Sequence, residues 1–192
     1  FKYATKALLH GALDFSGVPR RRRHELRGHL IILTYHSFSG ARPRGLFGSL
    51  PVRQFERHLG FLRDRFELVS LAQGLENIGA GLVRDKPFVA VTIDDGFERD
   101  PRIPDLLAEH GATATLFIVA SAVRDDPAYF QRFVDLGGTV NSHTIRHIHL
   151  KALDYRGQVR EICGGAKAIA EAENGVSGPF FRPPYGEWNS DT

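Results

Sequence analysis

The sequence predicts an α/β fold built on parallel strands. Short apolar runs, too short for core helices, alternate along the chain with segments whose apolar residues follow helical spacing. Polar side chains come directly after several of these runs, which is where parallel-strand folds carry their functional groups. The 192 residues, 42% hydrophobic and 24% charged, suit one globular domain. Periodicity leaves open whether the strands form an open doubly wound sheet or a barrel.

The first part of the chain is predicted to contain a strand with one helix before it and one helix after it. A short helix is expected over residues 2–13, ended by a Gly-Val-Pro break at 17–19. Residues 29–35 are apolar and rich in β-formers, which indicates a buried strand. A loop rich in Gly, Pro, Ser and Arg follows over residues 37–50, and a helix begins at Pro51. The apolar residues of this helix are spaced to form one face: Val52, Phe55, Leu59 and Leu62.

The middle of the chain is predicted to contain the central strand. Residues 66–70 are strand-like, and a weak helix then runs through Asn77 until Gly79 and Gly81 break it. Residues 88–93 form a continuous apolar run that stops at Asp94-Asp95-Gly96. This pattern is typical of a strand that is buried on both faces and ends in a turn.

The same alternation continues to the end of the chain. Three further strands and three further helices are expected: strands at 113–119, 139–142 and 180–182, and helices at 102–110, 127–136 and 155–172. Glycines follow the first two helices, and a Pro-Pro pair at 183–184 ends the last strand. The long helix at 155–172 is expected to turn one apolar side inward, formed by Val159, Ile162, Ala166 and Ile169.

Basic residues are concentrated in the N-terminal segment. Residues 1–30 hold seven of the 25 basic side chains and only two of the 22 acidic ones, so the rest is close to neutral. We therefore interpret residues 1–28 as a basic extension, with Arg20–Arg23 as a solvated linker, and residues 29–192 as the domain. A nucleic-acid partner is not expected. No apolar stretch reaches 18 residues, so no transmembrane segment is expected either.

The cysteine count does not indicate a cellular compartment, whereas the lack of methionine bears on whether the chain is a fragment. Cys163 is the only cysteine, so no internal disulfide is predicted. The sequence contains no Met and begins at Phe1, so either a leader was removed or this is a piece of a longer reading frame, and we interpret the chain as a fragment. The oligomeric state is left open.

Two histidines and two aspartates are the strongest candidates for chemistry. His143 and His147 are four residues apart, so one helical turn would place both imidazoles within reach of one metal ion. Asp94 and Asp95 end a buried strand, where adjacent carboxylates repel and need a cation or an arginine. Two imidazoles and one carboxylate form a usual catalytic zinc set, which leaves the second carboxylate free to act as a base. Arg182 would hold that base by a bidentate ion pair and keep its pKa low. These residues alone leave open which aspartate plays which role.

Three motifs in order carry a family resemblance. Residues 92–96 (TIDDG), 143–147 (HTIRH) and 182–186 (RPPYG) resemble the first three motifs of the polysaccharide deacetylase family, carbohydrate esterase family 4, with its NodB homology domain. The Leu-Thr-Tyr-His segment at 33–36 also resembles the first strand of one bacterial branch. The resemblance covers residues 29–192. It implies a distorted (β/α) barrel that is C-terminally incomplete here, lacking its last strands.

The resemblance also implies roles for individual residues. Asp94 resembles the catalytic base, and the metal ligands correspond to Asp95, His143 and His147. Arg182 resembles the residue that orients the base, and Tyr185 the residue whose backbone N–H holds the oxyanion. The expected ion is a divalent metal, with zinc favoured.

Further residues near these motifs have less specific roles. His36 and Pro184 are expected to line the substrate cleft, with a structural histidine as the alternative for His36. His149 is expected to be structural or solvent-facing, since it lies off the face shared by the two ligand histidines. The motifs of the family that follow the third, including the general-acid histidine, are expected beyond Thr192, so no general acid is assigned in this chain.

The function implied by the resemblance is metal-dependent hydrolysis of N-acetyl groups on a carbohydrate polymer. The expected partner is an N-acetylated carbohydrate, and the resemblance favours the cell envelope or the extracellular space. One alternative is an amide hydrolase, such as a deformylase, acting on a small sugar-linked substrate. Another is a catalytically dead carbohydrate-binding module, which should have lost the base or the ligands.

Overall fold

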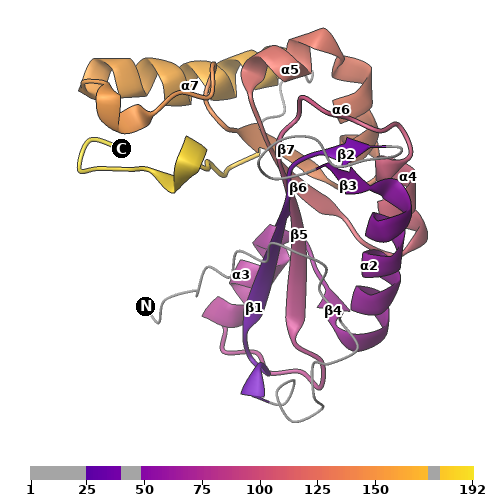
Figure 1. The fold of residues 1–192 in the computed structure, drawn as a ribbon. Coiled ribbons are helices and arrows are strands. Elements are labelled where there is room, and N and C mark those ends of the chain that lie inside the picture. The colour runs from indigo at the N-terminus through magenta and orange to yellow at the C-terminus, as the bar shows by residue number, and fades with distance from the viewer. Residues whose placement is uncertain (1–24, 40–48, 173–177) are drawn as a thin grey trace.

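The computed structural model describes residues 25–39, 49–172 and 178–192. The helix expected at 2–13, the arginine run at 20–23 and most of the loop at 37–50 lie outside the described residues. Helices pack along a twisted parallel sheet, and the C-terminal segment runs beside the longest helix (Figure 1). Within the described part of the chain, no helix is both long enough and apolar enough to cross a lipid bilayer.

The main sheet is parallel throughout, as the sequence predicts. Its strands are β1 (Leu30–Tyr35), β4 (Glu67–Leu68), β5 (Phe88–Asp95), β6 (Ala114–Ile118) and β7 (Thr139–Ser142). They lie in the order β1-β5-β6-β7, and β4 pairs with the beginning of β5. A second, two-stranded sheet is formed by β2 (Phe38–Ser39) and β3 (Leu50–Pro51).

The prediction of a strand at residues 180–182 is wrong. Among the residues that the structure describes, Phe181 makes one parallel bridge, to Ser142 at the end of β7. The two prolines that follow cannot donate backbone hydrogen bonds, so the pairing stops there. The described strands form an open sheet, which is consistent with the expected barrel that lacks its last strands.

The helices follow the predicted order with one addition. They are α2 (Val52–Arg65), α3 (Leu71–Gly79), α4 (Ile103–Glu109), α5 (Ala120–Asp125), α6 (Pro127–Asp135) and α7 (Tyr155–Ala172), with 3₁₀ turns η2 (Leu150–Ala152) and η3 (Pro184–Gly186). The buried residues of α2 are the four predicted from its spacing. Helix α3 extends through Gly79 and stops before Gly81, whose φ is +67°. The short helix α5 was not predicted, because it follows β6 without any break signal in the sequence.

The two faces of β5 pack against different sets of side chains. Val89, Val91 and Ile93 belong to the main core with residues of α2, α4 and α6, whereas Ala90 packs with residues of α3 and β6. Because side chains alternate along a strand, Thr92 and Asp94 continue the face that begins at Ala90. Asp94 is therefore carried into the protein interior by the same strand that builds the core.

The buried face of α7 shares Ile169 with the predicted one and otherwise differs from it. Val159 is exposed, while the buried residues are Gly157, Gln158, Glu161, Gly165, Ala168 and Ile169. The prediction counted only apolar residues, but Gln158 and Glu161 are buried because each has hydrogen-bond partners inside the protein. The helix thus presents small and polar residues to the rest of the domain, together with Ile169, which joins the main core.

We expect Phe55→Ala to lower the free energy of unfolding by about 3–5 kcal/mol. The Phe55 ring is fully buried and packs edge-on against the rings of Tyr35 and Phe38. Urea denaturation measures the change, with exposed Leu75→Ala on α3 as the control, which should shift stability by no more than about 0.5 kcal/mol. Equal stabilities of the two variants would contradict this account of the core.

Candidate functional site

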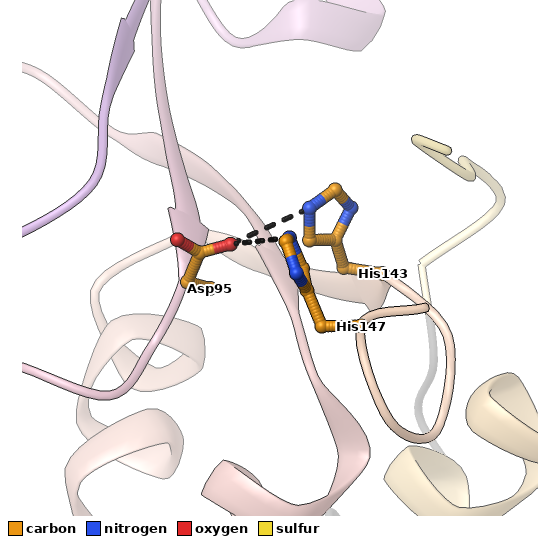
Figure 2. Close-up of side chains that lie close together, drawn as sticks. All are labelled: Asp95, His143 and His147. Carbon is orange, nitrogen blue, oxygen red and sulfur yellow. Dashed lines mark ion pairs between the residues drawn. The ribbon is translucent and has the colours of Figure 1, made fainter. Parts of the chain in front are cut away.

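Asp95, His143 and His147 converge at the carboxyl end of the sheet. Asp95 lies at the end of β5, and both histidines lie in the segment that follows β7, so that the carboxylate faces the two imidazoles (Figure 2). Asp95 Oδ1 lies 3.5 Å from His143 Nε2 and 3.2 Å from His147 Nε2. Within the described residues these three side chains form a group able to hold one metal ion.

The backbone that carries these side chains is turned sharply at both places. Asp95 has a φ of +67° and is followed by Gly96 at +86°, so the chain reverses direction directly after the strand. A Cβ on Gly96 would lie 2.8 Å from Ile118 Cγ2, so the turn presses closely against β6. A glycine fits both requirements, since it tolerates a positive φ and occupies little space.

The two histidines are not on a helix, which corrects the prediction. Residues 143–147 form an irregular turn in which Thr144 has a φ of +72° and His147 a φ of +55°. The imidazole rings still approach to 4.9 Å between centroids. The left-handed backbone at Thr144 and His147, rather than a helical turn, places the two imidazole rings close together.

Asp94 has partners of its own, separate from those of Asp95. Its side chain is buried, and Oδ1 lies 2.5 Å from Arg182 Nη1. Its other oxygen, Oδ2, lies 3.9 Å from His36 Nε2. The expected ion pair with Arg182 is therefore present, but one guanidinium nitrogen makes the contact, so the expectation of a bidentate pair is wrong.

Arg182 is held by several groups besides Asp94. Nη1 also contacts the hydroxyl oxygens of Thr92 at 3.1 Å and Thr34 at 3.4 Å, and the guanidinium lies 4.1 Å from the centre of the Phe117 ring. Sequence reasoning missed these threonines. Thr92 precedes Asp94 by two residues on one strand, so the period of two would have placed both on the same face.

The two aspartates differ in their pKa. Burial raises the pKa of Asp94 above its usual value, against the charges of Arg182, His143 and His36, which lower it. The expectation that Arg182 keeps this pKa low is therefore wrong in its net direction. Burial also acts to raise the pKa of Asp95, but hydrogen bonds from His143 and His147 outweigh it and hold that pKa well below the usual range.

The two separations between Asp95 and the imidazoles suit a tetrahedral metal ion. Zinc bonds of about 2.0–2.2 Å imply neighbouring ligand atoms roughly 3.3–3.5 Å apart. The measured separations of 3.2 and 3.5 Å match this spacing. His143 Nδ1 lies 2.6 Å from the carbonyl oxygen of Arg182, which can only accept a hydrogen bond. Nδ1 therefore carries the proton, and the lone pair of Nε2 is available to a metal.

The remaining predicted residues lie around this centre. The Tyr185 ring packs edge-on against His147 and stacks on His149 at 4.0 Å between centroids. His149 is largely exposed and pairs with Glu187 at 3.1 Å, so it is a surface residue with a structural contact. Tyr185 has a φ of +59°, and Pro184 is buried at the start of η3.

Asn141 is a further residue that sequence reasoning missed. It is completely buried, and its amide donates to the carbonyl of Leu116 on β6. Its Oδ1 accepts from the backbone N–H of Phe180, which fixes the segment leading to Arg182. A polar residue inside a predicted buried strand was the available signal.

The chain matches known proteins over its second half. Residues 82–192 match the family model described as polysaccharide deacetylase. A chitooligosaccharide deacetylase of Sinorhizobium fredii is 36% identical over 107 residues, covering 55% of this chain and 50% of the relative. A peptidoglycan-N-acetylglucosamine deacetylase of Bacillus cereus is 32% identical over 108 residues, covering 54% and 38%. The chain thus spans half or less of the length of these relatives.

The fold is also found among solved structures. A deacetylase of Streptococcus pyogenes, PplD, solved in complex with acetate, superposes with a TM-score of 0.68 at 17% identity. The superposition covers 84% of this chain and 76% of that one. At this identity the likeness concerns the fold alone, and it confirms the predicted parallel α/β arrangement.

Proposed function

The chain belongs to the polysaccharide deacetylase family, and we propose that it takes part in metal-dependent hydrolysis of N-acetyl groups on a carbohydrate polymer. One observation carries this proposal. Two adjacent carboxylates have separate partners, since Asp95 faces two imidazoles and Asp94 faces a guanidinium. A hydrolase of this kind needs one carboxylate for the metal and another for the proton of the attacking water.

The proposed metal is zinc, held by Asp95, His143 and His147. Zinc binds imidazole and carboxylate ligands, and three protein ligands are typical of its catalytic sites. When bound, the ion supplies Lewis-acid polarisation of the acetamide carbonyl and lowers the pKa of water.

Asp94 is the proposed general base, and Arg182 is proposed to orient it. The contact of Arg182 with Oδ1 leaves Oδ2 on the side of His36, at the edge of the site. A fixed carboxylate can accept the proton of a water molecule as that molecule attacks the carbonyl carbon. His36 and Pro184 are proposed to line the substrate cleft.

Tyr185 is proposed to contribute to oxyanion binding through its backbone N–H. Its ring contacts with His147 and His149 fix this residue beside the metal ligands. A backbone N–H that is already in position stabilises developing negative charge without reorganisation during the reaction.

Acetate release tests the proposal directly. We expect the protein extended through the segment after Thr192 that the resemblance implies to release acetate from chitooligosaccharides or peptidoglycan. This activity should be lost after treatment with a chelator and regained with zinc, whereas residues 1–192 alone should release little or no acetate. The substrates are those named for the relatives. Formate release from a small N-formyl sugar without any acetate release would favour the amide-hydrolase alternative. Binding of chitooligosaccharides without turnover at saturating zinc, by the protein that includes the segment after Thr192, would favour the binding module.

A further inference from the structure

Glu161 is a buried carboxylate outside the family motifs. It lies on the inner face of α7 and is 2% exposed. Its Oε1 lies 2.7 Å from Arg146 Nε and 2.6 Å from Arg146 Nη2. Its Oε2 accepts hydrogen bonds from two successive backbone N–H groups, those of Ile145 at 3.1 Å and Arg146 at 3.2 Å. A buried side chain that accepts from this many donors is held in one orientation.

The groups that donate to Glu161 belong to the turn between the two metal-ligand candidates. In this turn, four consecutive N–H groups donate to side chains. The N–H of Thr144 donates to Ser142 Oγ, those of Ile145 and Arg146 donate to Glu161, and that of His147 donates to Thr144 Oγ1. Within the described residues, backbone hydrogen bonds link His143 to Ile118 and Thr144 to Ala120. Among the side chains that accept from these four N–H groups, Glu161 is the one outside the turn and its preceding strand.

The conformation of this turn is unfavourable without such support. Thr144 and His147 both have positive φ angles, and Thr144 is β-branched, a type that rarely adopts this backbone region. Such a backbone persists only where surrounding contacts determine it. The hydrogen bonds to Glu161 span the two residues between these strained positions, so they are placed to hold both histidines at their observed spacing.

Helix α7 is built to bring Glu161 close to the turn. Gly165 lies one turn after Glu161, and a Cβ there would lie 2.5 Å from Ser142 Oγ and 2.9 Å from the carbonyl carbon of Thr144. Only a residue without a side chain allows the helix to approach this closely. The apolar spacing of α7 gave no sign of this contact, because the residues that make it are glycine and glutamate.

We infer that Glu161 is a positioning residue for the metal centre. Its carboxylate fixes the turn that carries His143 and His147 and so sets the separation of their imidazoles, without touching the metal or the substrate. This inference rests on the proposed metal site. It predicts that loss of the Glu161 charge changes both the affinity for the metal and the geometry of the ligands. Substitution of residues that orient metal ligands without binding the metal typically changes metal affinity by about 10–100-fold.

The test measures metal binding by the purified protein. We expect Glu161→Gln to weaken zinc binding about 10–100-fold in a chelator-competition titration, and to shift the visible absorption bands of the cobalt-substituted protein. Glu171→Gln is the matched control, since Glu171 lies on the same helix with an exposed side chain 3.9 Å from Lys167. This control should keep wild-type affinity and an unchanged cobalt spectrum.

A second variant covers the case in which Glu161→Gln does not fold. Arg146→Gln removes the positive partner of Glu161 from a side chain that is 68% exposed, so the fold should survive. It should weaken zinc binding in the same direction. If Glu161→Gln, or Arg146→Gln in its place, binds zinc with wild-type affinity and an unchanged cobalt spectrum, the positioning role is refuted while the metal site stands. A wild-type protein that binds no zinc refutes the metal site and the role together.

Discussion

Asp95→Ala is expected to abolish specific zinc binding and, with it, acetate release. The substitution removes the one carboxylate that faces both imidazoles, at 3.5 Å from His143 and 3.2 Å from His147. Since indirect partners of metal ligands already change affinity about 10–100-fold, loss of a direct ligand should exceed about 100-fold. Zinc competition with a chromophoric chelator measures the affinity. His143→Ala should give a loss of the same order, because it removes a ligand of the same proposed centre.

The control for this experiment is the other adjacent pair of aspartates. Asp125 is exposed, and its neighbour Asp126 caps α6 by accepting a hydrogen bond from the Tyr129 N–H at 3.2 Å. Asp125→Ala should therefore leave zinc affinity unchanged. Retention of wild-type affinity in Asp95→Ala would show that the metal does not bind where the three side chains converge.

The sequence predicts the sheet and the convergence of the site well, because both depend on simple periodicity. The continuous apolar run at residues 88–93 becomes β5, buried on both faces, and the polar residues that follow it lie at the carboxyl edge. The carboxyl ends of parallel strands meet at one edge, so Asp95 and His143 come together from residues far apart in the chain. These parts need only the alternation of apolar and polar residues.

The remaining features depend on contacts that periodicity does not encode. The turn carrying His143 and His147 is left-handed at two residues, because Glu161 and Thr144 supply its hydrogen bonds. Helix α7 packs mainly through small and polar residues, so a count of apolar residues identified only Ile169 of its buried face. In both cases a buried polar side chain stands where an apolar residue would have predicted burial, and its hydrogen-bond partner lies elsewhere in the chain.

The different roles of Asp94 and Asp95 could not be derived from the residues alone, and the structure shows how the two side chains differ. Adjacent carboxylates on a strand are equivalent in the sequence, and only the resemblance assigned them different roles. In the structure Asp94 continues the inner face of β5 toward Arg182, whereas the positive φ of Asp95 turns its carboxylate toward the histidines. The two groups thus have different partners although they are neighbours in the chain.

This separation leads to the second large prediction, for Asp94→Asn. Asparagine has nearly the same shape and can still accept a hydrogen bond from Arg182, but it does not take up a proton as a carboxylate does. We expect acetate release to fall by about 10²–10⁴-fold, the usual contribution of a general base. Zinc affinity should stay close to that of the wild type, since Asp94 is not among the three converging ligands.

Measuring both turnover and zinc affinity distinguishes a general base from a metal ligand. Turnover at saturating zinc reports the proton-transfer role, and the chelator titration reports the metal site, so each variant gives two independent values. Asp94→Asn should change only the first value, whereas Asp95→Ala should change both. An Asp94→Asn protein with wild-type turnover would exclude Asp94 as the base. A parallel loss of zinc affinity and turnover in that variant would instead make Asp94 part of the metal centre, contrary to its contact with Arg182.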